Sequence, residues 1–195
     1  KIFAGESFDG MVNLDLMEEL RPAFADIDVD LADAVNASEK ALTQYSQPEL
    51  NGTALDTIST SRFTHDILTT DLYPGTRWNL ALAYTYTTPG IPFILYGSEI
   101  AMDGGNPPDN QQLMGFRADK ELIDYITNLG RLRQELPALT RGTFEVLHQE
   151  NGLVVFKRVY KSEVLIVAIN NTSKTQEVTI SKDKLKNDQE LRGLL

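Results

Sequence analysis

The pattern of apolar and polar positions changes near residue 140 of this chain. Before that point apolar residues recur every three to four positions over residues 31–45, 78–86 and 122–136, which predicts amphipathic helices. After residue 143 they alternate with polar residues over short runs, as in the strands of an antiparallel sheet. We therefore predict two domains, residues 1–139 and residues 140–195.

Short apolar runs stand between the predicted helices of the first domain. Residues 11–16, 53–60 and 90–96 are rich in apolar or β-branched side chains and too short for helices, so we predict three strands. The run 90–96 is bounded by Pro and Gly residues and is expected to be buried on both faces. Thr76 and Asp119 are predicted to cap the two helices that flank this strand. The alternation of strands and helices predicts a parallel sheet with right-handed crossovers.

The second domain contains four predicted strands, at residues 144–147, 153–160, 164–169 and 176–180. The first two flank Asn151-Gly152, which is the strongest short signal for a β-hairpin. Four strands are few for a two-sheet sandwich. We therefore expect the apolar pair Leu194-Leu195 to begin a further segment.

The composition narrows the classes of function. The 195 residues are 42% hydrophobic and 24% charged, as in a soluble globular protein, and no apolar run approaches the length that spans a bilayer. A formal net charge of -10 argues against nucleic acid or an anionic membrane as a partner, whereas neutral sugars are compatible with it. The absence of cysteine excludes disulfides, thiolate nucleophiles and thiolate metal ligands.

Residues 88–99 carry the most specific motif, Thr-Pro-Gly-Ile-Pro-Phe-Ile-Leu-Tyr-Gly-Ser-Glu. This stretch resembles the eighth barrel strand of the α-amylase family of glycoside hydrolases, whose pattern is G-x-P-x-x-Y-Y-G-x-E/Q. The matching residues are Gly90, Pro92, Tyr96, Gly97 and Glu99, whereas Leu95 replaces the first Tyr. Residues 108–114 resemble a second family segment, D-x-R-x-x-M, with Asp109 as the acid and Gln where Arg is common.

The resemblance implies an α/β fold in which the C-terminal part of a (β/α)8 TIM barrel, a partial barrel, is followed by an antiparallel β-sandwich domain. Residues 11–16, 53–60 and 90–96 then correspond to the sixth, seventh and eighth barrel strands. We expect the open strand edges to pair with the missing part of the barrel or with a second chain. Residues 1–6 resemble neither a signal peptide nor a transit peptide, so we expect the middle of a longer chain. By analogy with bacterial amylases we expect a secreted protein, with a cytoplasmic location as the alternative.

Enzymes of this family retain the anomeric configuration, using one carboxyl group as nucleophile and a second as acid/base. The nucleophile belongs to the fourth strand and the acid/base to the fifth, and both strands are expected to precede residue 1. Glu6 follows a Gly as the acid/base does. However, Gly10 already opens the next predicted strand and leaves no room for a crossover, so we interpret Glu6 as a loop residue.

The third acid of the family lies after the seventh strand, in the motif N-H-D-x-x-R-F. Arg62-Phe63 matches the final pair, which places Ile58 and Ser59 at the positions of the His and the Asp. The alternative register uses His65-Asp66, but no Arg follows where one is expected, and we interpret this pair as solvated loop residues. The resemblance further implies substrate binding by Arg62, Tyr96, Glu99 and Asp109.

We expect no cofactor, because the sequence contains no cluster of metal-binding residues and the family's calcium ligands lie largely outside this chain. The isolated His148 is interpreted as structural. Three hypotheses for function follow: part of an α-amylase-type hydrolase that acts on starch or maltooligosaccharides, a non-catalytic α-glucan-binding or scaffolding relative, or a half-barrel that needs a second chain. We expect the chain alone not to hydrolyse glycosides, because the two catalytic carboxylates precede it and Ser59 replaces the third acid.

Overall fold

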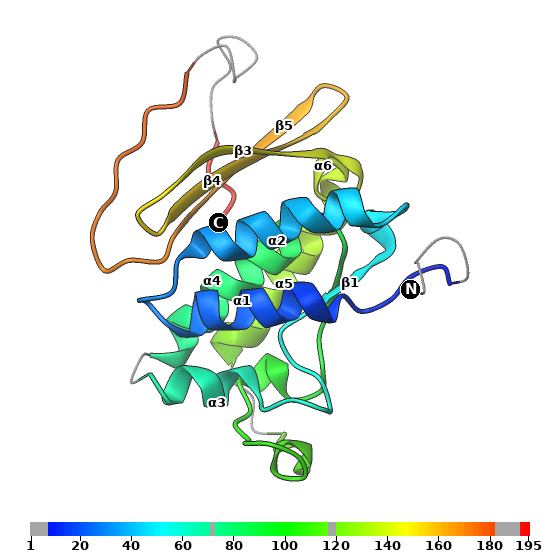
Figure 1. Cartoon of the computed structure of the whole chain (residues 1–195), viewed down its shortest axis with the longest axis vertical. Helices are drawn as coiled ribbons and strands as arrows, with labels where there is room; N and C mark the ends of the chain where they lie inside the picture. Colours follow the sequence, from blue (N-terminus) through cyan, green and yellow to red (C-terminus); the bar gives the residue numbers. More distant parts are fainter. Residues whose placement is uncertain (1–7, 71–72, 117–119, 182–191) are drawn as a thin grey trace.

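Helices dominate the first 141 residues of the computed structural model, and three long strands follow them (Figure 1). The structure describes residues 8–70, 73–116, 120–181 and 192–195. The helices are α1 (Leu14–Ala25), α2 (Leu31–Gln44), α3 (Phe63–Leu68), α4 (Pro74–Thr87), α5 (Lys120–Glu135) and α6 (Pro137–Arg141), with short 3-10 turns η1 (Pro48–Leu50), η2 (Ser98–Ile100) and η3 (Asp109–Gln111). The strands are β1 (Gly52–Ala54), β2 (Ile91–Phe93), β3 (Thr143–Glu150), β4 (Leu153–Tyr160) and β5 (Glu163–Asn170).

The helix α2 follows its sequence pattern closely. Asp30 is its N-cap and accepts a hydrogen bond from the Ala32 N–H at 2.9 Å, and the predicted apolar positions face the core. The start of α4 differs from the prediction, because Tyr73 and not Thr76 is its N-cap. Pro74 occupies the first turn, where its fixed φ angle suits a helix and its missing N–H costs nothing. The predicted cap Asp119 lies outside the described residues.

The strand predicted over residues 11–16 is wrong except at one residue. Val12 forms a single parallel bridge with Gly52, and the chain then enters α1 at Leu14. The cause is Asn13, whose Oδ1 accepts a hydrogen bond from the Leu16 N–H at 3.1 Å and so caps the helix.

The strands β1 and β2 pair in parallel, with Gly52 opposite Ile91 and Ala54 opposite Phe93. The parallel direction and the sequential order of Val12, β1 and β2 were predicted and are confirmed. Both strands are shorter than predicted. Residues 57–60 form a turn instead, in which the Thr57 Oγ1 accepts a hydrogen bond from the Ser59 N–H at 3.2 Å. A Thr that bonds locally to the backbone supports a turn as readily as a strand.

The prediction that the run 90–96 is buried on both faces is wrong. Ile91 is 51% exposed and Phe93 is 45% exposed. Alternate residues of a strand point to the same face of the sheet. One face of β2 therefore presents apolar side chains that no described residue covers.

The last three strands form an antiparallel sheet in the order β3-β4-β5. The predicted hairpin is confirmed, since Asn151 (φ 52°) and Gly152 (φ 72°) form its turn and Glu150 pairs with Leu153. Residues 176–180 do not form the fourth predicted strand. The sheet packs on the helices, so the described residues form no two-sheet sandwich (Figure 1).

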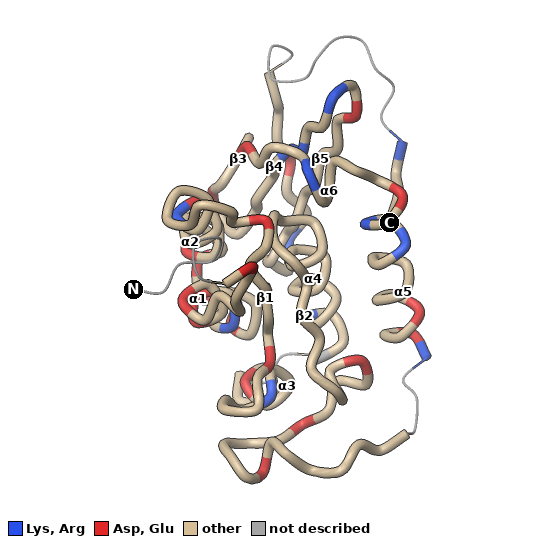
Figure 2. The backbone as a smooth tube through the Cα atoms, turned by 90° about the vertical axis from the view of Figure 1, so that its right-hand side faces the viewer, with Lys and Arg blue, Asp and Glu red and all other residues tan. Residues whose placement is uncertain are grey.

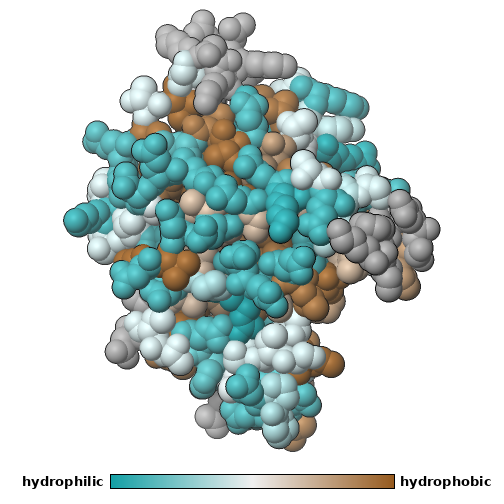
Figure 3. All heavy atoms as spheres, in the orientation of Figure 1, coloured by the Kyte–Doolittle hydropathy of each residue, from teal (hydrophilic) through white to brown (hydrophobic). Residues whose placement is uncertain are grey.

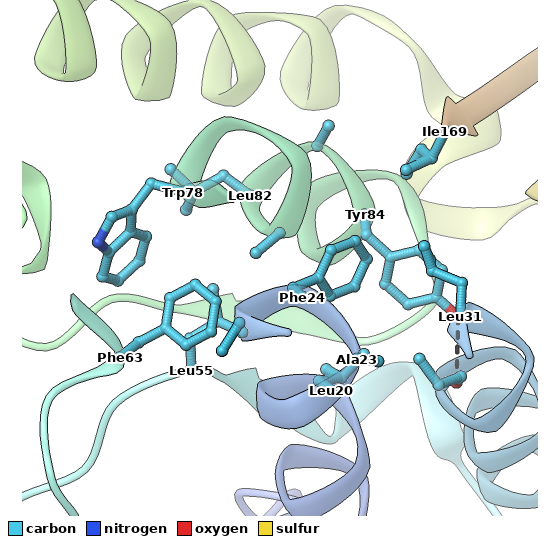
Figure 4. Packing of buried hydrophobic residues seen from close by; sticks show 14 of the residues in the cluster. Leu20, Ala23, Phe24, Leu31, Leu55, Phe63, Trp78, Leu82, Tyr84 and Ile169 are labelled. Atoms are coloured by element: carbon cyan, nitrogen blue, oxygen red, sulfur yellow. Dashed lines mark hydrogen bonds between the residues drawn. The ribbon is translucent and has the colours of Figure 1, made fainter. Parts of the chain in front are cut away.

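One hydrophobic core joins the sheet to the helices across the predicted domain boundary (Figure 4). The Tyr84 ring of α4 packs against Phe24 of α1 at 5.4 Å between centroids and against Phe156 of β4 at 5.9 Å. Its hydroxyl group pairs with the Ser38 Oγ at 2.8 Å. No helix in the described ranges is long and apolar enough to cross a membrane.

Two buried side chains also fasten the sheet to the helices. The Arg158 guanidinium of β4 donates to the Thr87 carbonyl at the end of α4, at 2.5 Å. Burial and the nearby charge of Arg133 lower the pKa of Arg158 to about 10. Asn171 donates to the Ala23 carbonyl at 2.9 Å and accepts a hydrogen bond from Arg77.

Charge is unevenly distributed along the chain. Asp and Glu residues are frequent in α1 and α2, whereas Lys and Arg gather in α5, α6 and the sheet (Figure 2). The face seen in Figure 3 is largely hydrophilic, with smaller hydrophobic areas between the polar side chains.

Candidate functional site

The carboxyl ends of β1 and β2 open into two segments, residues 55–62 and 94–112, that lie against each other. We call these two segments the rim. The Arg62 N–H donates to the Gly104 carbonyl at 2.9 Å, and the Asn110 Nδ2 donates to the Ile58 carbonyl at 3.0 Å. Functional groups of parallel α/β sheets gather at this end of the strands. The rim is therefore the place to look for a site.

Asp56 joins the two segments of the rim from inside. Its carboxylate accepts hydrogen bonds from the Phe63 N–H at 2.5 Å and from the Ser98 Oγ at 2.7 Å, and Arg62 lies 4.0 Å away. Burial raises the pKa of Asp56, and the hydrogen bonds and the charges of Arg21 and Arg62 oppose this effect. The carboxylate is enclosed, so it holds the rim together and is not presented to a ligand. Sequence analysis missed Asp56, although an acid directly after the apolar pair Ala54-Leu55 was a usable signal.

Arg62, predicted to bind substrate, lies beneath the rim and is 0% exposed. Its Nε donates to the Asn110 carbonyl at 2.9 Å and its Nη1 to the Tyr96 carbonyl at 2.8 Å. The guanidinium also lies 4.7 Å from the centroid of the Tyr96 ring, within range of a cation–π interaction. Arg62 can therefore influence a ligand only through the residues that it holds.

Tyr96, the second predicted substrate-binding residue, lies at the surface of the rim and is 41% exposed. Its hydroxyl group donates to the Gln112 carbonyl at 3.1 Å. Gly97 follows with a φ of 85°, and a Cβ at this position would come within 2.6 Å of the Met102 Sδ. The strained turn and the hydroxyl contact fix the direction of the Tyr96 ring.

Glu99 and Asp109, the other predicted substrate-binding residues, have different surroundings. Glu99 lies in η2 and is half-buried, and its Oε2 has no hydrogen-bond partner in the described part of the chain. Asp109 is exposed and accepts hydrogen bonds from the Gly105 N–H at 2.6 Å and the Gln112 Nε2 at 2.8 Å. These two hydrogen bonds lower the pKa of Asp109.

Ile58 and Ser59, at the positions of the family His and Asp, lie on the exposed turn of residues 57–60. Ile58 is 61% exposed. The turn is held from below, because the Asn110 Nδ2 donates to the Thr60 carbonyl at 2.6 Å and the Gln111 Nε2 to the Ile58 carbonyl at 3.1 Å. The backbone of this turn is thus well fixed, whereas its outward side chains are an aliphatic group and a hydroxyl.

The interpretation of His65-Asp66 as solvated loop residues is wrong, because both belong to α3. Asp66 accepts hydrogen bonds from the buried Arg21 at 2.9 Å (Nε) and 2.5 Å (Nη2), and from the Ser61 Oγ at 2.8 Å. The His65 Nδ1 lies 3.0 Å from the Asp103 Oδ1, and both side chains are about half exposed. Asp66 is therefore occupied in holding α1 against the rim.

The remaining predicted groups add no reactive centre. Glu6 lies outside the described residues. Among the described residues, no three His, Asp or Glu side chains come together to hold a metal ion, so they do not fit a calcium site. His148 lies in β3 beside a bulge. A hollow of about 470 Å³ lies away from the rim, between β2, α5 and α6, and its lining includes Pro92, Arg133 and Arg141.

Comparison with known proteins gives consistent matches along the chain. The family model of the alpha-amylase C-terminal domain matches residues 142–195. A beta/alpha-amylase of Paenibacillus polymyxa is 32% identical over 158 residues, which are 77% of this chain and 13% of that protein. A cyclomaltodextrin glucanotransferase of Bacillus sp. (strain 38-2) is 30% identical over 176 residues, 89% of this chain and 24% of that protein. The chain thus spans a quarter or less of the length of these relatives.

Two solved structures are similar over most of the chain. An alpha-amylase from Anoxybacillus superposes with a TM-score of 0.91 at 44% identity, covering 98% of this chain and 42% of that one. The alpha-amylase from Geobacillus thermoleovorans, complexed with acarbose, gives a TM-score of 0.89 at 44% identity, covering 92% of this chain and 40% of that one. The match thus extends over both the helices and the sheet, and with the sequence relatives it shows that the chain belongs to the α-amylase family of glycoside hydrolases.

Proposed function

We propose that the chain is part of a hydrolase that acts on the α-glucosidic bonds of starch or maltooligosaccharides, and that its rim binds the glucan. The observation that carries this proposal is the contact between Arg62 and Tyr96. These residues belong to two different family motifs, 34 residues apart in the chain, and they meet at the carboxyl ends of adjacent parallel strands. Ligand-binding residues of (β/α)8 barrels come from several strand ends in this manner.

In this proposal Val12, β1 and β2 are the sixth, seventh and eighth strands of a (β/α)8 barrel. Their parallel order and the likeness to the two alpha-amylase structures support it. The remaining strands of the barrel, on the missing part of the protein or on a second chain, would cover the exposed side chains of Ile91 and Phe93. Burying such apolar surface stabilises by about 25 cal/mol per Å².

Tyr96 is the residue through which the rim would hold a sugar ring. One face of its ring is covered by the Arg62 guanidinium, and its hydroxyl group is bonded to the backbone. A fixed and partly exposed aromatic ring offers a flat apolar surface at little entropic cost. The open face of the Tyr96 ring can therefore stack against the apolar face of a glucose unit.

The chain alone should bind glucan without hydrolysing it. Retaining hydrolysis requires two carboxyl groups about 5–5.5 Å apart on either side of the bond. Asp56 is enclosed by its hydrogen bonds, and Ser59 provides a hydroxyl where the family has its third acid. A hydroxyl cannot supply full negative charge to an oxocarbenium-like transition state, which typically costs several kcal/mol. Ile58 and Ser59 also favour the second candidate, a non-catalytic glucan-binding relative.

The binding proposal is tested by titrating the purified chain with maltoheptaose and measuring the affinity calorimetrically. We expect Tyr96→Ala to weaken binding about tenfold, equivalent to ~1.4 kcal/mol, and Tyr96→Phe to stay within about threefold of the wild type. Tyr73→Ala is the matched control, because Tyr73 is also exposed and lies outside the rim. A wild-type chain that does not bind maltoheptaose would contradict the proposal.

The proposal of inactivity is tested with a blocked maltoheptaoside at neutral and at mildly acidic pH. We expect no turnover by the chain alone. Turnover that His65→Ala or Asp66→Asn abolishes would show that the alternative register is right. Turnover that only Glu6→Gln abolishes would identify Glu6 as the acid/base.

A further inference from the structure

We infer that Asn51 binds an ordered water molecule in a small cavity between α1, α2 and the amino-terminal ends of β1 and β2. The cavity has a volume of about 20 Å³. A single water needs ~10–15 Å³ on such a measure. Its lining residues are Asn13, Leu16, Ser38, Ala41, Leu42, Pro48, Asn51, Thr53, Pro89 and Gly90.

The Asn51 side chain is the reason to assign a ligand to this cavity. Asn51 is only 4% exposed, yet neither its Nδ2 nor its Oδ1 has a hydrogen-bond partner among the described residues. Buried amide groups in folded proteins are nearly always hydrogen-bonded to protein or to ordered water. An amide that stayed unpaired in this position would keep its full cost of desolvation.

The chemistry of the cavity fits water better than a larger or charged ligand. Its polar groups are neutral amide, hydroxyl and backbone groups, and no Asp, Glu, Lys or Arg side chain lines it. Asn51 can donate to a water oxygen and accept from a water O–H. A neutral donor and acceptor side by side suit a molecule that both donates and accepts.

The position of the water gives it a structural role. The backbone of Asn51 already ties the two strands together, since the Ile91 N–H donates to the Asn51 carbonyl at 2.7 Å. The side chain faces a cavity that is also lined by the N-cap Asn13 of α1 and by Ser38 of α2. A water bonded to Asn51 would therefore connect the strand ends to the two helices that cover them.

The direct test is the exchange of magnetisation between water and the Asn51 side-chain amide protons, measured by NMR on the ¹⁵N-labelled chain. A water held in the cavity gives nuclear Overhauser effects of opposite sign in the laboratory and rotating frames. We expect this signature at the Asn51 Nδ2 protons. Its absence there, with the amide resonances assigned, would overturn the inference.

A substitution gives a second readout with a different sign for the two cases. Asn51→Leu removes the amide at nearly constant volume. If water satisfies the amide, we expect the variant to have a lower Tm, because it displaces a bonded water and leaves its other partners unpaired. A higher Tm would indicate that the wild-type amide is unpaired and would overturn the inference. Asn79→Leu, the same change at an exposed position of α4, is the control for any general effect of the new Leu and should shift the Tm little.

Discussion

The strands β2 and β4 contain similar apolar residues but have opposite surroundings. Leu153, Val154, Val155 and Phe156 of β4 are all buried, because β4 is the central strand of its sheet and packs on the helices. In β2, Ile91 and Phe93 are about half exposed. The difference teaches that an apolar run predicts the need for burial, while the burial itself depends on which neighbours the chain supplies.

Replacing one Phe in each strand tests this comparison with the largest expected effect. Phe156→Ala should lower the free energy of unfolding by about 3–5 kcal/mol, because it leaves a cavity in the shared core. Phe93→Ala should lower it by less than about 1 kcal/mol, because the side chain is already half in water. Both values come from urea unfolding of the isolated chain. Equal losses would show that β2 is buried in solution by a second copy or by rearrangement.

The link between the sheet and the helices gives a smaller effect. Asn171→Ala removes the hydrogen bond to the Ala23 carbonyl and leaves the buried Arg77 without its amide acceptor. We expect a loss of about 1–3 kcal/mol and a single unfolding transition for both proteins. Asn128→Ala, on the exposed side of α5, is the matched control. Two separate transitions in the wild type, followed by circular dichroism and tryptophan fluorescence, would contradict a shared core.

The buried acid of the rim should show itself through pH. Burial raises the folded-state pKa of Asp56 above its ordinary value of 3.8, so the unfolded chain releases its proton first as the pH rises. The stability that Asp56 contributes is therefore full below about pH 3.8 and is lost as the pH rises through the folded-state pKa. Asp56→Asn should then gain stability relative to the wild type between about pH 3.5 and pH 6.5, measured by urea unfolding. A constant difference, as we expect for the exposed control Asp28→Asn, would show that Asp56 is not buried in solution.

Asp109, on the outer side of the same rim, should show a small effect of opposite sign. Hydrogen bonds from Gly105 and Gln112 lower its pKa below 3.8. The stability from these bonds is present above the unfolded pKa and is lost as the pH falls through the folded-state pKa. Asp109→Asn should therefore lose a little stability at neutral pH and none in strong acid. The carboxyl chemical shift of Asp109, followed by NMR through the titration, checks the direction of the pKa shift.

The elements that the sequence predicted well are those set by local contacts. The helix α2 has its cap Asp30 within the segment, and the β3–β4 hairpin has Asn151-Gly152 between its strands. The strands β1 and β2 pair with distant segments, so their lengths depend on contacts that no local pattern contains. In the rim, the resemblance brought Arg62 and Tyr96 to attention, but their contact and the burial of Arg62 could not be predicted. Both follow from the parallel pairing of β1 and β2.

The central claim, that the rim binds an α-glucan, is tested most directly by titrating the ¹⁵N-labelled chain with maltoheptaose and following its amide resonances. We expect the largest shifts at residues 57–60, 96–99 and 103–112, with Tyr96 among them. Shifts confined to the hollow lined by Arg133 and Arg141, or no shifts at millimolar maltoheptaose, would contradict this claim.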